Sequence, residues 1–168
     1  MARQFRLWEH AQVVNLLPNA ADAAGRTSGY ISVAYGHKVF IVCEVNQGNA
    51  AQVTFTPLQA TNSAGANAKA IGSAPIAANP NTAISGGSDQ FTFPAAAANY
   101  QTDVGINNKI VIFEIDPAEV MDINNTAVGA FNHIAIQTSA SNAANITSAR
   151  AIVTPLRDAR QNPPTTYV

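Results

Sequence analysis

The stretch KVFIVCEV, residues 38–45, decides the fold of this chain. It is nearly continuous in β-branched and aromatic residues, which are the residue types enriched in strands. Such a run is typical of a strand that is covered on both faces. A second run of this kind, KIVIFEI at residues 109–115, lies in the last third of the sequence. We therefore expect a β protein built around these two strands.

Shorter candidate strands surround these two runs. Five apolar or alternating runs are bounded by Pro, Gly or Asn, at residues 12–17, 30–35, 52–56, 131–138 and 148–154. Pro18, Pro57 and Pro155 are predicted to end three of them, because proline cannot donate to a sheet ladder. The runs at 38–45 and 52–56 are predicted to pair as a hairpin.

The helical signal is short. Asp116 and Pro117 fit the N-cap and the first position of one helical turn. Residues 58–100 are rich in Ala, Asn, Gly, Ser and Pro. A low-complexity insertion is one interpretation of that segment. We prefer short edge strands joined by long loops, because isolated apolar residues recur there.

Many strands without a long helix predict an all-β fold, a jelly-roll-like antiparallel β-sandwich with long loops and extended terminal arms. The expected organisation is an N-terminal arm at residues 1–10, a single sandwich domain at 11–155 and an extended C-terminal tail at 156–168. The predicted core consists of Val39, Ile41, Val53, Phe55, Val111, Phe113, Ile134, Ile136 and Ile152.

The composition limits the possible functions. Only 11% of the 168 residues are charged and the formal net charge is -1, whereas about 25% charged residues is usual. This balance excludes an electrostatically driven nucleic-acid binder. No apolar run approaches the roughly 18 residues that a membrane span needs, and no secretory leader is expected. We therefore expect neither a nucleic acid nor a membrane among the partners.

The low charge also favours contact with protein. Asn, Gln, Ser and Thr replace the usual ions, and alanine makes up roughly a fifth of the residues. Such a surface loses its water at low cost, because no ions must be desolvated. We interpret it as a surface suited to close packing against other chains. The alternative is a neutral surface with no special role.

Signals of metal or thiol chemistry are scarce. His10, His37 and His133 lack the short spacing of a metal-binding pair. Cys43 is the single cysteine, so it cannot form an internal disulfide. Its place inside the strongest strand is typical of a small core residue. We expect no metal site and no cofactor.

Four carboxylates, Glu114, Asp116, Glu119 and Asp122, cluster in the sequence. Glu114 and Asp116 could share a strand face and act as the acid–base pair of a glycoside hydrolase, and such a cluster could also bind calcium. We prefer structural roles, because Asp116 fits a helix cap. The chain is therefore not expected to be an enzyme, and no catalytic residue is assigned.

The terminal arms are the best candidates for an interface. The residues concerned are Arg3, Phe5, Arg6, Trp8, Arg157 and Arg160. Arg and Trp are favoured at binding hot spots. Arms of this kind can drape over a neighbouring subunit, where the anchors offset the entropy lost on ordering. The alternative is two frayed termini.

Three segments carry a resemblance to a known family, at residues 17–28, 37–51 and 138–149. Together they resemble small virion proteins of tailed bacteriophages, of the kind that accompany the major capsid protein. The resemblance covers about residues 12–155 and offers no catalytic signature.

The resemblance implies a capsid decoration, or cement, protein. Such a protein is made in the cytoplasm of the host bacterium and binds the outer surface of the phage head. It bridges and stabilises neighbouring major capsid subunits, and it is often a homotrimer. Two alternatives remain: a tail or neck component, and a carbohydrate-binding jelly roll in which Trp8, Tyr30, Tyr35 or Tyr100 stacks on sugars.

Overall fold

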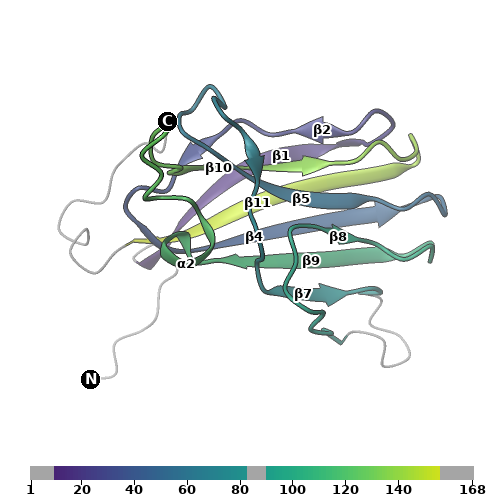
Figure 1. The fold of residues 1–168 in the computed structure, drawn as a ribbon. Helices are drawn as coiled ribbons and strands as arrows, with labels where there is room; N and C mark the ends of the chain where they lie inside the picture. The colour runs from purple at the N-terminus through teal and green to yellow at the C-terminus, as the bar shows by residue number, and fades with distance from the viewer. Residues whose placement is uncertain (1–9, 83–89, 156–168) are drawn as a thin grey trace, which may run out of the picture.

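The computed structural model describes residues 10–82 and 90–155 (Figure 1). Nearly all regular structure in these ranges is antiparallel β-strand, which confirms the predicted fold class. The elements in chain order are β1 (Gln12–Ala21), β2 (Arg26–Thr27), β3 (Ile31–Ser32), β4 (Gly36–Gln47), β5 (Thr54–Ala60), β6 (Lys69–Ala70), β7 (Ile76–Asn79), β8 (Tyr100–Gln101), β9 (Asn108–Ile115), α2 (Pro117–Val120), β10 (His133–Thr138) and β11 (Asn145–Pro155).

Within the described ranges the strands form two sheets. Sheet A is five-stranded in the order β1-β11-β4-β9-β7, and sheet B is six-stranded in the order β2-β10-β5-β6, with β3 on β10 and β8 on β5. Four antiparallel pairs are nested: β1 with β11, β2 with β10, β4 with β9, and β5 with β6. This nesting, in which the first strand meets the last, is the arrangement of a jelly roll.

The predicted hairpin of residues 38–45 with residues 52–56 is wrong. β4 pairs with β11 and β9 in sheet A, whereas β5 pairs with β10 in sheet B. The turn between them therefore crosses from one layer to the other. Both strands carry an apolar inner face, and two such faces bury each other best when they oppose across a sandwich.

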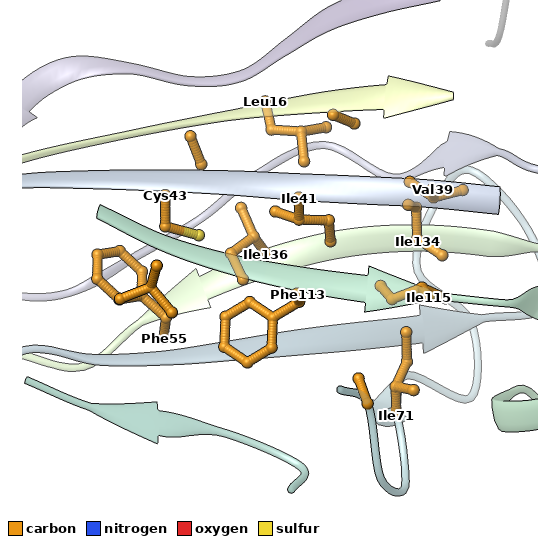
Figure 2. Packing of buried hydrophobic residues seen from close by; sticks show 14 of the residues in the cluster. Leu16, Val39, Ile41, Cys43, Phe55, Ile71, Phe113, Ile115, Ile134 and Ile136 are labelled. Atoms are coloured by element: carbon orange, nitrogen blue, oxygen red, sulfur yellow. The ribbon is translucent and has the colours of Figure 1, made fainter. Parts of the chain in front are cut away.

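The core lies between the sheets, and all predicted core residues except Ile152 are buried there. In Figure 2, Ile41 and Phe113 of sheet A point toward Ile136 of sheet B. Ile152 points the other way, because Ala151 and Val153 occupy the inner positions of β11 and successive side chains alternate. Residues 151–153 are all apolar, so the sequence did not reveal which face each one occupies.

The two strand ends predicted at Pro18 and Pro57 are also wrong. β1 runs on to Ala21 as an edge strand, and its pairing with β11 shifts register on both sides of Leu17, where proline is tolerated. In β5, the carbonyl of Pro57 accepts a hydrogen bond from Ile71 N over 2.9 Å. Pro57 has no N–H to return that bond, so the β5–β6 ladder ends at the next pair, Leu58 and Ala70.

The segment at 58–100 contains short edge strands, as predicted, in its described part. β6, β7 and β8 lie there, and isolated bridges join Ala74 to Ala97 and Ala78 to Thr92. Residues 83–89 lie outside the described ranges. The predicted strand at 30–35 is reduced to Ile31–Ser32.

β4 differs from the expectation that both its faces are covered. Val39, Ile41, Cys43 and Val45 are buried, whereas the alternate residues are half-exposed. Within the described ranges, therefore, only the inner face of β4 is fully covered by protein.

Candidate functional site

The six predicted interface residues fall in the terminal segments outside the described ranges. These are Arg3, Phe5, Arg6, Trp8, Arg157 and Arg160. The structure does show where those segments start. Gln12 of β1 lies opposite Val153 of β11, so the described chain begins and ends at one end of the sandwich (Figure 1). We call this the terminal end.

The outer face of sheet A is apolar near the terminal end. The strand register places Val13, Ile152 and Phe40 in one row across β1, β11 and β4. Val42 and Ile112 are partners in the next row, across β4 and β9. We call these five residues the apolar face. Val13 is 51% exposed and the other four are half-exposed.

Two ion pairs neutralise the charges on this sheet face. Lys38 of β4 pairs with Glu114 of β9. The hydrogen bond and the charge of Glu114 raise the pKa of Lys38. Arg150 of β11 lies beside Val42 in the second row of this face, and its Nη1 is 3.1 Å from Oε1 of Glu44 in the next row. Because each charge already has a partner, covering this face leaves no isolated ion without water.

A buried lysine organises the loop between β8 and β9. The side chain of Lys109 is only 2% exposed, and its Nζ lies 3.0 Å from Asp103 Oδ1. The ammonium also donates to Gln47 Oε1 over 3.0 Å and to the carbonyl of Gly105. Val104 and Ile106 in this loop are 61% and 63% exposed. Sequence reasoning missed this arrangement, since a lysine at the start of a strand carries no distinguishing signal.

The carboxylates considered for catalysis have separate structural contacts. Glu114 pairs with Lys38, and Asp122 pairs with Lys69. Asp116 Oδ1 accepts a hydrogen bond from Ala118 N over 3.1 Å, which confirms the predicted cap of α2. The arrangement therefore gives no support to a hydrolase pair at Glu114 and Asp116.

The cysteine and the histidines have distinct surroundings. Cys43 is fully buried, as predicted for a core residue, and burial raises the pKa of its thiol. His37 lies in β4, whereas His133 lies in β10 of the other sheet, where burial lowers its pKa. In the described ranges, no group of three or more His, Cys, Asp or Glu residues is placed to hold a metal ion.

The tyrosines considered for sugar stacking come from three separate places. The ring of Tyr30 packs against Gly65, Tyr35 lies in the turn before β4, and Tyr100 pairs with Phe55 in sheet B. Trp8 lies outside the described residues. None of the helices in the described part of the chain is long and apolar enough to cross a membrane.

Comparisons with known proteins establish no family. No family model matches the chain, and no curated protein matches it. Among solved structures, the SPBc2 prophage-derived protein YomS is similar with a TM-score of 0.47 at 7% identity, over 86% of this chain and 93% of that one.

Two sugar-binding proteins show weaker structural similarity. The N-terminal cellulose-binding domain of Cellulomonas fimi beta-1,4-glucanase C has a TM-score of 0.32 at 12% identity, over 86% of this chain and 76% of that one. A putative sugar-binding protein from Bacteroides thetaiotaomicron has a TM-score of 0.30 at 12% identity, over 79% and 66%. At these scores the similarities assign neither a partner nor a ligand to this chain.

Proposed function

We propose that this chain is a capsid decoration protein of a tailed bacteriophage, which binds the outside of the head and bridges neighbouring major capsid subunits. The resemblance of residues 17–28, 37–51 and 138–149 to small virion proteins suggested this role. The observation that carries it is the apolar face of sheet A, which the described residues leave partly exposed.

The energetics favour a protein partner on that face. Outward positions of a sandwich are usually polar, yet here Phe40, Val42 and Ile112 point outward. Covering apolar surface contributes about 25 cal/mol per Å², and a stable interface buries roughly 800 Å² on each partner. Because the nearby ions are paired, little of this gain is lost to desolvation of charge.

The ends of the described ranges lie close to this face. Val13 and Ile152 are one residue away from the Gln12–Val153 pair, and the described ranges begin at His10 and end at Pro155 close by. Under the proposal, the apolar face provides the apolar area that is buried against the capsid. The arginines and aromatic residues of the terminal segments bind the capsid as hot-spot residues. Repetition over the head then multiplies modest contacts into avidity.

Binding to expanded heads that lack the protein tests this proposal. The full chain is mixed with heads, the heads are sedimented, and bound copies are counted by gel densitometry. We expect saturable binding in hundreds of copies. Deleting residues 1–10 should abolish it, and Val42→Asp should weaken it at least about tenfold, because a carboxylate would replace an apolar side chain in the contact.

Gln137→Asp is the matched control, since Gln137 is an exposed position on β10 in sheet B. It should bind like the unmodified chain. Unchanged binding of Val42→Asp and of the deletion would contradict the proposal. Exclusive recovery of the protein with purified tails would instead identify a tail component.

A further inference from the structure

A polar hollow lies on the outer face of sheet A, at the end opposite the terminal end. Its volume is about 310 Å³. Its lining comes from β1, β4, β9, β11 and the segment after β7, and consists of Asn19, Glu44, Val45, Asn46, Thr82, Asn108, Lys109, Ile110, Ile146 and Ser148. The ends of the described chain lie at the other end of the same sheet, and the apolar face lies between them and the hollow.

The strand register gives the floor of the hollow a regular layout. Ile146, Asn46 and Asn108 form one row across β11, β4 and β9. Ser148, Glu44 and Ile110 form the next row. Neighbouring strands lie about 4.8 Å apart and alternate residues about 6.8 Å apart. The floor therefore measures roughly 10 Å by 7 Å, which is the size of one or two sugar rings.

The two long sides of the hollow are closed by different elements. Asn19 contributes from β1, close to the register shift between Leu17 and Ala20. On the other side, Thr82 N donates a hydrogen bond to the carbonyl of Asn108 over 2.9 Å. A second hollow shares Asn46 and Asn108 and continues beyond the ends of the strands. A ligand longer than one ring thus has room to extend.

The polar groups of the hollow have unused hydrogen-bonding capacity. Among the described residues, the side-chain amides of Asn19, Asn46 and Asn108 make no hydrogen bond, so each offers donors and an acceptor. The carboxylate of Glu44 is fixed by Arg150 Nη1 at 3.1 Å and by Ser148 Oγ at 3.2 Å. It keeps lone pairs free to accept from a hydroxyl or an amide N–H.

The apolar groups of the hollow narrow the ligand class. Ile110 and Ile146 supply small aliphatic contacts, and the lining given by the described residues contains no aromatic side chain. The flat face of a sugar ring therefore finds no stacking platform, whereas a methyl group fits beside either isoleucine. An acetamido group combines such a methyl with an N–H and a carbonyl that match the Asn amides.

From this combination we propose that the hollow binds an N-acetylated amino sugar within a neutral glycan. The hollow has a different lining from the apolar face, and it begins one row beyond Val42 and Ile112 on the same face of sheet A. A capsid contact that ends at the row of Val42 and Ile112 leaves the hollow open to the surroundings. Because aromatic stacking is absent from this lining, we expect a dissociation constant on the order of 1 mM for a single site.

Two oligosaccharides that differ only at the acetamido group test the proposal. Tetra-N-acetylchitotetraose, called chitotetraose below, and cellotetraose share the same backbone, and each is titrated into the full labelled chain while backbone amide signals are followed by NMR. Chitotetraose should shift the signals of Asn46, Asn108 and Ile146. Cellotetraose should bind at least about tenfold more weakly, since it lacks the groups that the amides and isoleucines contact.

Substitutions locate the binding. Asn46→Ala and Asn108→Ala should each weaken chitotetraose binding about tenfold, whereas Asn15→Ala, an exposed position two rows away on the same sheet face, should not. Equal affinity for the two sugars, shifts confined to other surfaces, or no shift at millimolar sugar would each overturn the proposal.

Binding of the variants to phage heads serves as the second readout. If Asn46→Ala instead lowers head occupancy, the hollow is a protein contact and the glycan assignment is wrong, while the decoration function still stands.

Discussion

Single buried polar residues shape the ends of this sandwich. Lys109 is an internal cation whose ammonium is surrounded by oxygens of Asp103, Gly105 and Gln47. Gln47 in turn donates from Nε2 to the Asp103 carbonyl over 2.9 Å. The loop is therefore organised by one charge, in the way that a bound metal ion would organise it.

Replacing this cation should cost stability. Lys109→Met keeps the aliphatic length but leaves buried Gln47 with fewer partners and Asp103 without its counter-charge. We expect a loss of about 2 kcal/mol in the free energy of unfolding, measured by urea denaturation. Lys38→Met removes an exposed ion pair and should leave the free energy of unfolding nearly unchanged. Equal losses for the two variants would contradict the role given to Lys109.

The burial of Cys43 leads to a simple chemical prediction. The thiolate is the reactive form, and burial raises the pKa of this thiol. We expect the native chain to resist a thiol reagent at pH 8 and the urea-unfolded chain to react fully. Mass spectrometry counts the added groups. Rapid labelling of the native chain would show that β4 does not bury its inner face.

At the scale of elements, the connections between the two sheets depend on tight backbone approaches. Gly25 precedes β2 with φ +72, and a Cβ there would lie 2.7 Å from Thr138 O and 2.8 Å from Ala140 N. Only glycine can adopt this left-handed backbone and also leave room for these two atoms without strain. This position holds the start of β2 against the end of β10.

A pair of glycine substitutions tests this constraint. Gly25→Ala should lower the free energy of unfolding by about 1–3 kcal/mol, because both the left-handed backbone and the added methyl are unfavourable. Gly29→Ala places a methyl where nothing lies within 4 Å, and it should leave stability nearly unchanged. Thermal denaturation of both variants measures the difference. A loss in Gly29→Ala as large as that in Gly25→Ala would contradict this account.

The elements also show how far the sequence could predict the structure. Strand character in 38–45 and 109–115 and the cap at Asp116 follow from local residue types, and the structure confirms them. Strand pairing is non-local, since Val39 of β4 lies opposite both Val153 and Ile115. No local signal distinguished this arrangement from a hairpin. The strand ends predicted at Pro18 and Pro57 are wrong for the same reason. Whether a proline ends a strand depends on whether its nitrogen faces a paired neighbour.

At the scale of the whole molecule, sheet A has two chemically different halves. Near the terminal end its outer face is apolar, and at the far end it carries the amide-lined hollow. The hollow could not be predicted from the sequence, because Asn19, Asn46 and Asn108 are widely separated and belong to three strands. The nearly continuous apolar run at 38–45 did indicate that both faces of β4 need covering. The described residues fully cover one of them, and the proposed capsid contact would cover the other.

A cryo-electron microscopy reconstruction of phage heads with the chain bound is the most direct test of the proposed function. It should show the sandwich on the outer shell surface, with the terminal end toward the capsid subunits and Phe40, Val42 and Ile152 against a neighbouring protein. Heads that show no bound sandwich, or a sandwich attached only through sheet B with the apolar face open to solvent, would contradict the account.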